Sequence, residues 1–395
     1  MGKIELDHTG AGSGVTLSSD GTDLLLNGAA IGGGGGALEL YAENPSSPVT
    51  PLAGGLNAVA VGSGSNGGGD NSVALGVGSA AGDHAFSAVI TGGNTSYGAV
   101  GDYSIAMGQS ARALGINSIG IGYLSRAVAN ESISFGPSTD ANSYRSAAIG
   151  YNAQTTSGAN ATALTNSYAS GTDSFAAAIA NNTSSYGATG ASSVAIGYQG
   201  KATAFGAVSL GRGTQATANY SLASGFNSVA SASYGVALGY EATTYTQTSI
   251  AFSAGSFSGI AGQHQGRIFA FRQRTTDATP KVLVTDGGSS GSTNDQIILP
   301  NNSAYAFHGT IVARQQASAG TACAAWKIEG LIRREGSAGT TVLVNSATTV
   351  LDNTPAWGMA LSADTTNGGL KIEVTGAAAT NIRWVATVHT SEVTY

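Results

Sequence analysis

The sequence predicts an all-β protein in which a solenoid of short parallel strands is followed by an antiparallel β-sandwich. A motif of about 14 residues returns many times between residues 57 and 253. From residue 267 onward, apolar and polar residues alternate in segments separated by Gly, Asn, Asp and Pro, as in antiparallel strands and their turns. The density of Gly, Ser, Thr and Asn, together with the lack of a 3.6-residue apolar period, excludes a helical array.

The repeat is clearest as Ser-Val-Ala-Ile-Gly at residues 193–197. The position held there by Val194 recurs at steps of 13 to 15 residues, apart from two steps of 19 residues that lie 89 residues apart. The segments around these two long steps match, so the array looks partly duplicated as a block. The recurring positions are Val59, Val73, Phe86, Ile105, Ile119, Ile133, Ala147, Thr162, Phe175, Val194, Val208, Leu222, Val236 and Ile250.

Each repeat has the pattern of one rung made from two short strands. Val194 and Ile196 are two residues apart and are expected on one face of a strand, with Ala195 on the other face. Gly197 is suited to a turn at positive φ, and a second pair of small residues begins at Ala202. We expect Ala side chains to face Val and Ile across a thin interior. Because one rung cannot bury its own apolar face, the rungs must stack.

The composition changes divide the chain into four segments. Residues 1–56 are expected to be an attachment or capping segment with a Gly/Pro-rich linker, and residues 57–253 form the repeat array. Residues 254–266 are a linker, and residues 267–395 are the β-sandwich. Capping the solenoid end and docking onto another protein are both open for residues 1–56, because a solenoid needs its ends covered. The expected sandwich strands are Arg267–Gln273, Lys281–Val284, Gln296–Leu299, Ala304–Arg314, Ala324–Arg334, Thr340–Val344, Gly358–Ala363, Leu370–Val374 and Ile382–Val393.

Charge and cysteine content restrict the environment and the partners. The net charge is −6, only 10% of residues are charged and no basic run occurs, so a nucleic-acid partner is not expected. No apolar stretch is long enough for a membrane span, and none follows residues 1–7 as a signal peptide would require. The single cysteine, Cys323, excludes an internal disulfide. Its alanine neighbours predict a small buried core residue. Folding in a cytoplasm is expected.

No catalytic, cofactor or metal site is expected. Residues 62–67 and 287–291 fit a dinucleotide fingerprint and a nucleophile elbow as strings, but each precedes an expected strand rather than the required helix. Glycan-cleaving enzymes need two carboxylates across the scissile bond. The acidic residues of the array are not expected to repeat in register on neighbouring rungs, and the five histidines show no ligand spacing. These acids are Asp70, Asp83, Asp102, Glu131, Asp140, Asp173 and Glu241.

Aromatic residues in loops are candidates for receptor or glycan binding, since an aromatic face beside planar polar groups suits a sugar ring. The two matched long repeats each place a Tyr and an Asn in one loop. The alternative is that each Tyr packs its own loop onto the roll. A tryptophan after a proline is a third aromatic candidate because an exposed loop is expected there, whereas Trp326 and Trp384 are expected in the core. The candidates are Asn94, Tyr97, Asn182, Tyr186 and Trp357.

The Ser-Val-Ala-Ile-Gly array resembles the head repeats of trimeric autotransporter adhesins, the YadA-like β-roll, and similar repeats occur in phage tail fibres. This resemblance implies a left-handed parallel β-roll in which three chains share an axis. The segment after the array resembles a domain found at the ends of phage tail fibre proteins. The motifs that carry this second likeness are residues 275–280, 298–300, 326–330, 355–357, 364–368 and 382–386.

The resemblance implies a homotrimeric phage tail fibre or receptor-binding protein that adheres to the host bacterial surface without catalysis. The N-terminal segment would attach to a tail or baseplate protein of the virion. The β-roll would be a spacer, and the sandwich would meet a glycan or protein receptor. Synthesis in the host cytoplasm and assembly into the virion are implied, with no cofactor and no membrane insertion. A bacterial surface adhesin, a polysaccharide depolymerase tailspike and a purely structural virion fibre remain alternatives.

Overall fold

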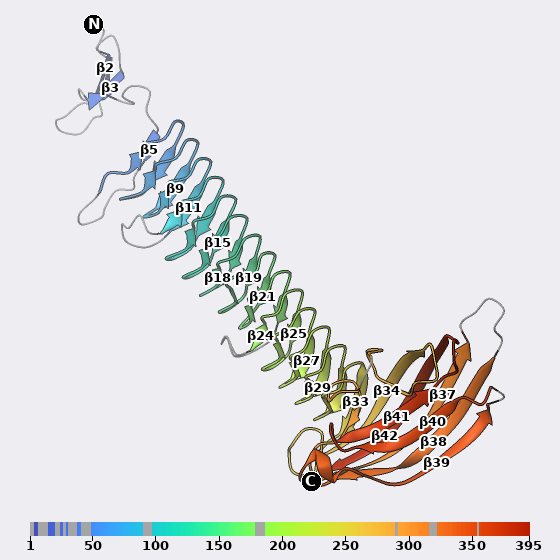
Figure 1. Ribbon diagram of the computed structural model, residues 1–395. Coiled ribbons are helices and arrows are strands. Elements are labelled where there is room, and N and C mark those ends of the chain that lie inside the picture. Colours follow the sequence, from blue (N-terminus) through green and yellow to red (C-terminus); the bar gives the residue numbers. More distant parts are fainter. Residues whose placement is uncertain are drawn as a thin grey trace. The chain divides into compact units, whose positions relative to one another are not determined.

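The computed structural model describes residues 49–89, 97–177, 186–288, 291–315, 322–353 and 355–395, together with five short strands before residue 49. It confirms an all-β protein with a parallel solenoid followed by antiparallel sheets. The chain forms two units, Met1–Thr165 and Asn166–Tyr395, and both contain stacked solenoid rungs (Figure 1). Among the described residues, no helix has the length and hydropathy needed to span a membrane.

The first unit opens with a small antiparallel sheet and continues with solenoid rungs. The small sheet contains β1 (Ile4–Leu6), β2 (Val15–Ser19), β3 (Leu24–Leu26) and β4 (Ala29–Ala30). One parallel ladder of rungs contains β5 (Leu38–Leu40), β7 (Val59–Val61), β9 (Val73–Gly76), β11 (Phe86–Val89), β13 (Ile105–Met107), β15 (Ile119–Ile121), β17 (Ile133–Phe135), β19 (Ala147–Ile149) and β21 (Thr162–Leu164). The other contains β6 (Leu52–Ala53), β8 (Asn66–Gly67), β10 (Ser79–Ala80), β12 (Gly98–Ala99), β14 (Arg112–Ala113), β16 (Arg126–Ala127), β18 (Asp140–Ala141) and β20 (Gln154–Thr155).

The second unit opens with rungs of the same kind. One ladder contains β23 (Phe175–Ala177), β25 (Val194–Ile196), β27 (Val208–Arg212), β29 (Leu222–Phe226), β31 (Val236–Tyr240) and β33 (Ser249–Ala254). The other contains β22 (Tyr168–Ala169), β24 (Gly187–Ala188), β26 (Lys201–Ala202), β28 (Gln215–Ala216), β30 (Val229–Ala230) and β32 (Thr243–Thr244). Neighbouring strands pair in parallel and in register, for example Val194 with Val208, so the 14-residue period corresponds to one rung.

The rung interior is lined by alanine rather than by valine and isoleucine, which corrects the expected arrangement. Ala195 is fully buried, whereas Val194 is half-buried and Ile196 is 39% exposed on the outer surface. The physical reason is the close approach of the two ladders. At Gly120, a Cβ atom would lie only 2.4 Å from the Arg112 carbonyl oxygen. The interior therefore accepts only small side chains, and the larger apolar side chains point outward.

The turn after most of the long strands depends on glycine, as expected, whereas Thr165 and Ser253 take this position on two rungs. Gly197 has a φ of +117°, which side chains with a Cβ rarely adopt. A Cβ atom on Gly197 would also lie 2.4 Å from the Gly211 carbonyl oxygen of the next rung. Both the dihedral angle and the spacing between rungs therefore require glycine there.

The last rung passes directly into a large antiparallel sheet, because β33 pairs with β34. This sheet has the order β34 (His264–Thr275), β42 (Ile382–Thr394), β37 (Ser303–Gln315), β38 (Cys323–Arg334) and β39 (Val342–Asp352). A smaller antiparallel sheet contains β35 (Lys281–Val282), β36 (Ile297–Ile298), β40 (Gly358–Asp364) and β41 (Gly369–Thr375). A 3-10 turn, η1, covers Ala338–Thr340.

The two C-terminal sheets enclose one apolar core. Ile311 and Trp384 from the large sheet lie in the same buried cluster as Ile297 and Ile372 from the small sheet. Strict alternation along β42, with every second residue buried, produces this face. Alternation also explains why the prediction for Cys323 is wrong. The inward position of β38 belongs to the next residue, an alanine, and Cys323 is exposed.

A buried ion pair lies where the rungs meet the large sheet. Arg267 Nε of β34 is 2.6 Å from Glu392 Oε1 of β42, and both side chains are fully buried. An Nη atom of Arg267 donates to the Tyr245 hydroxyl at 2.9 Å, and that hydroxyl bonds to the Tyr305 hydroxyl. Burial raises the pKa of Tyr245 to about 12. The network therefore joins the last rungs to the sheet through a charge held away from water.

Candidate functional site

A polar groove of about 600 Å³ runs across four neighbouring strands of the first unit. We call it the roll groove. It lies on the ladder of short strands, where the outward residue of each two-residue strand is in register with the next one. These outward residues are 14 positions apart in the sequence and about 4.8 Å apart in space. The roll groove residues used below are Tyr97, Arg112, Arg126, Asp140, Asn152 and Gln154.

The groove combines an aromatic ring with a row of planar polar groups. Arg112 on β14, Arg126 on β16 and Asp140 on β18 are consecutive partners in the ladder. The Arg112 guanidinium carbon lies 5.9 Å from the centre of the Tyr97 ring, within range of a cation–π contact. Arg126 Nη1 lies 3.0 Å from Asp140 Oδ2. A small number of convergent polar groups beside an apolar surface is typical of a small-molecule site.

Two polar atoms of the groove are buried without partners among the described residues. They are Arg112 Nε and Asp140 Oδ1. Burial raises the pKa of the Asp140 carboxyl, while the Asn142 side chain and the charges of Arg126 and Arg112 act in the opposite direction. Buried donors and acceptors normally find a partner in protein, water or ligand. Because both atoms are buried, a polar ligand in the groove would meet the exposed Arg126 guanidinium rather than these two atoms.

The aromatic predictions have mixed outcomes. Tyr97 lines the roll groove and is half-buried against the alanine core of the roll, so packing onto the roll is at least part of its role. Tyr186, its counterpart in the second block, is also half-buried. Asn94 and Asn182 lie outside the described residues. The predicted exposure of Trp357 is wrong.

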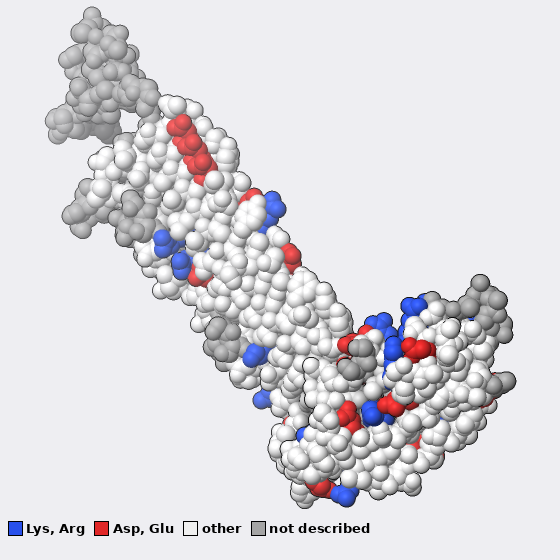
Figure 2. All heavy atoms as spheres, viewed as in Figure 1, with Lys and Arg blue, Asp and Glu red and all other residues white. Residues whose placement is uncertain are grey.

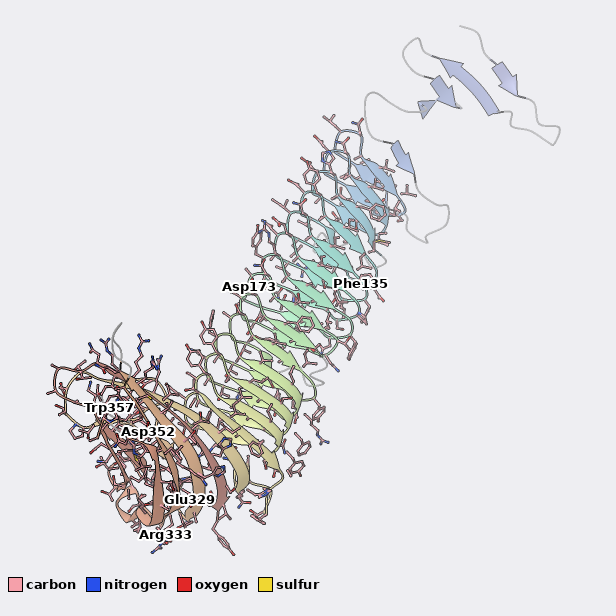
Figure 3. All side chains as sticks on the ribbon, turned by 90° about the vertical axis from the view of Figure 1, so that its right-hand side faces the viewer. Phe135, Asp173, Glu329, Arg333, Asp352 and Trp357 are labelled. Carbon is pink, nitrogen blue, oxygen red and sulfur yellow. The ribbon has the colours of Figure 1, made fainter. Side chains whose placement is uncertain are left out.

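Trp357 is only 5% exposed. It lies among the C-terminal strands (Figure 3). Its ring centre is 5.9 Å from that of Trp384. Asn353 holds its backbone from both sides, with Nδ2 donating to the Trp357 carbonyl at 2.8 Å and Oδ1 accepting from its N–H at 2.9 Å. The segment after Pro355 thus folds the ring inward, and Trp357 contributes to the core.

The roll groove is specific to the first block of the array. Moving 89 residues along the chain replaces Arg112 by Lys201 and Arg126 by Gln215, and it places Val229 where Asp140 stands. The ladder confirms the first of these matches, because Gly98 pairs with Arg112 just as Gly187 pairs with Lys201. The ion pair therefore has no counterpart in the second block. Sequence reasoning missed these residues, although their 14-residue spacing would have placed them in one row.

The acidic residues of the first rungs are in register, contrary to expectation. Asp70, Asp83 and Asp102 occupy one position on three successive rungs, and each accepts a backbone N–H from the rung before it. The Leu56 N–H donates to Asp70 Oδ1 at 2.8 Å. The N–H groups of Asp70 and Asp83 donate to the next carboxylates, each at 2.9 Å. A red stripe marks these rungs in Figure 2. These carboxylate hydrogen bonds connect the turns of successive rungs, which supports the predicted role of the aspartates in turns.

Comparison with known proteins identifies the repeats. The YadA head domain repeat family matches residues 53–81, 99–125, 113–139, 127–153, 188–214, 202–228, 216–242 and 230–252. No curated protein matches the sequence.

Two solved phage proteins share a distant structural similarity. One is tailspike protein gp49 from Acinetobacter baumannii bacteriophage Fri1, a capsular polysaccharide depolymerase, at 10% identity over 69% of this chain and 46% of that chain, with a TM-score of 0.19. The other is the tailspike protein of Acinetobacter phage vB_ApiP_P1, at 10% identity over 74% of this chain and 50% of that chain, with a TM-score of 0.17. The chain spans about half the length of these two tailspikes. The matches to the YadA head domain repeat and the in-register parallel ladders together show that the chain contains YadA head repeats forming a parallel β-solenoid.

Proposed function

We propose that this chain is a phage tail fibre or receptor-binding protein that forms a homotrimer and adheres to the host bacterial surface without catalysis. The observation that carries the proposal is a solenoid of YadA head domain repeats whose larger apolar side chains point outward, followed by an antiparallel sandwich. Residues 1–56 would dock to a tail or baseplate protein of the virion, and the sandwich would meet the host surface.

The outward apolar row supports assembly of several chains. Phe135 and Ile149 of the first unit are 51% and 39% exposed, and Leu238 and Phe252 of the second unit are 38% and 51% exposed. Figure 3 labels Phe135 at the outer surface of the solenoid. Phe135 pairs with Ile149 and Leu238 with Phe252 on neighbouring rungs, and contiguous exposed apolar surface is typical of an interaction interface. Three chains sharing an axis would bury these side chains within each unit, and three weak receptor sites would then act together through avidity.

The roll groove supports binding of a glycan. Its guanidinium and carboxylate groups present donors and acceptors in fixed planes, and the exposed Arg126 guanidinium, held 3.0 Å from Asp140, suits the hydroxyl groups of a sugar. The second block lacks the Arg126–Asp140 pair, so one groove of this kind is expected in each chain. The ligand would be a sugar of the host cell surface.

The solution mass is the first test of assembly. One chain has a mass of 38.9 kDa, so light scattering is expected to give about three times this value. Phe135→Asp places a charge in the apolar row and is expected to lower the mass. Ile116→Asp is the matched control. Ile116 is 44% exposed and takes, one rung later, the position that Asp70, Asp83 and Asp102 hold on the earlier rungs. A monomeric wild type would contradict the proposed assembly.

Adhesion is tested by binding of the labelled full chain to a panel of bacterial strains. Binding to one strain, weakened at least about tenfold by Arg126→Gln, would support both the function and the groove. A chain that binds no strain but stays attached to the virion would indicate a structural fibre. Release of reducing sugar from host polysaccharide would indicate a depolymerase instead. Detection of the chain on a bacterial surface in the absence of phage would favour a bacterial adhesin.

A further inference from the structure

Three arginines stand side by side on the outer face of the large C-terminal sheet. Arg274 of β34 pairs in register with Arg383 of β42, which in turn pairs with Arg314 of β37. All three side chains are exposed, on the face opposite the apolar core. Arg272 lies two residues before Arg274 and points to the same face. We call these four residues the arginine row.

No carboxylate neutralises the arginine row within the part of the chain that the structure describes, because none of the ion pairs there includes any of the four residues. Arg272 Nη2 donates to the Asp286 carbonyl at 2.7 Å, and Arg274 Nη2 donates to Asn381 Oδ1 at 3.2 Å. The nearby Asp286 carboxylate accepts the Gly288 N–H instead. Like charges on directly opposite strand positions are destabilising, so an anion bound there would relieve repulsion.

The same sheet face shows the contrasting arrangement. Lys327 lies 3.9 Å from Glu329, and Arg333 is paired with Glu335. These two positive charges are therefore matched locally, whereas those in the row are not. Figure 2 shows positive and negative side chains together over the C-terminal sheets.

A hollow of about 350 Å³ lies at the arginine row. Arg272, Arg274 and Arg383 line it, together with Gly287 and Val385. A Cβ atom on Gly287 would lie 2.8 Å from Arg272 Nε, so glycine allows the Arg272 side chain to pack against this turn. A hollow of this size accepts a group about as large as one or two sugar rings.

We propose that the arginine row binds the anionic groups of an acidic glycan. The planar guanidinium fork matches carboxylate and phosphate oxygens with two parallel hydrogen bonds. That this glycan belongs to the host surface rests on the proposed adhesion function. The anion site itself is argued from the geometry of the row alone. A nucleic acid fits less well, because the row spans only three adjacent strands, about 10 Å, and offers few contacts compared with the six to ten phosphates of a typical DNA site.

The test is calorimetric titration of the full chain with trigalacturonate as a carboxylate probe and with inorganic phosphate. We expect one of the two to bind, and which one binds identifies the source of the charge. Binding is expected to weaken as NaCl rises from about 20 mM to about 300 mM, because exposed charges are screened. The neutral sugar maltotriose is expected not to compete.

The variant is Arg314→Gln combined with Arg383→Gln, and its matched control is Lys327→Gln combined with Arg333→Gln on the same sheet face. The first is expected to lose about tenfold or more in affinity for the probe, and the control to keep it. Unchanged affinity in the first variant, or no binding of either probe to the wild type, would overturn the anion site. Tighter binding of a short oligothymidylate than of either probe would overturn the assignment to a glycan. None of these results depends on adhesion to cells, so the two proposals can fail separately.

Discussion

The buried pair of Arg267 and Glu392 provides the sharpest test of the energetics of this fold. Replacing Glu392 by glutamine keeps the size and one acceptor for Arg267 Nε, but it removes the negative charge. Both side chains are fully buried at 2.6 Å, so the Arg267 guanidinium would stay buried without a counter-charge. The Gln265 amide donates to Glu392 Oε2 at 2.9 Å. In one of the two orientations of the new glutamine amide at position 392, the Gln265 donor would face another donor.

Breaking a buried pair in this way costs about 3–5 kcal/mol. With a urea dependence of about 2 kcal/mol per molar, the unfolding midpoint should fall by about 2 M. Tryptophan fluorescence reads this locally, because the three tryptophans, Trp326, Trp357 and Trp384, all lie in the core of the C-terminal sheets.

Two controls separate charge burial from other causes. Glu335→Gln removes an exposed pair with Arg333, whose side chains are 49% and 56% exposed, and should change the free energy of unfolding by less than about 1 kcal/mol. The double change of Arg267 to methionine and Glu392 to leucine should recover most of the loss, because apolar replacement of a buried pair is often neutral. A Glu392→Gln variant within about 1 kcal/mol of the wild type would refute the reasoning.

Three further outcomes are expected. Gly120→Ala places a Cβ atom 2.4 Å from a carbonyl oxygen and should destabilise the solenoid by about 1–3 kcal/mol. Gly54 has open space around it, so Gly54→Ala should leave the stability unchanged. Thermal unfolding followed by circular dichroism compares the two variants. Burial raises the pKa of Asp140 in the folded state above its unfolded value. The free energy of unfolding should therefore decrease as the pH rises above about 4. Asp140→Asn should remove this decrease from a plot of the free energy of unfolding against pH. The pKa of Tyr245 is raised from 10.0 to about 12, so folding favours its protonated form, and stability should fall as the pH rises from 10 towards 12; an alkaline unfolding midpoint unaffected by Tyr245→Phe would contradict this.

The strand arrangement was largely predictable from local patterns. The 14-residue spacing of residues such as Val194 and Val208 predicted both the strands and their register, because a solenoid stacks equivalent positions. The alternation in residues 382–393 predicted β42 nearly to its ends, Ile382 and Thr394. The strand expected at residues 340–344 runs instead over Val342–Asp352, since its second half carried no apolar alternation but pairs with β38 through two register shifts.

The facing of side chains was less predictable, because periodicity does not say which side of a strand is inside. Ala195 lies inside and Ile196 outside because the two ladders approach too closely for larger side chains, and this separation is a property of the stacked rungs. Cys323 is exposed for a similar reason, as the inward positions of β38 are set by its partner strands. Trp357 is buried because Asn353 holds the loop closed from both sides.

The sequence by itself determined the repeat, the parallel solenoid, the antiparallel sheets and the change between them near residue 254. These features follow from the spacing of residue types along short stretches of the chain. Only the tertiary structure brought Arg112, Arg126 and Asp140 into one groove, and only strand pairing placed Arg274, Arg314 and Arg383 in one row. The residues of the row lie up to 111 positions apart in the sequence (383 − 272). Their proximity depends on sheet order and register, which no local pattern encodes.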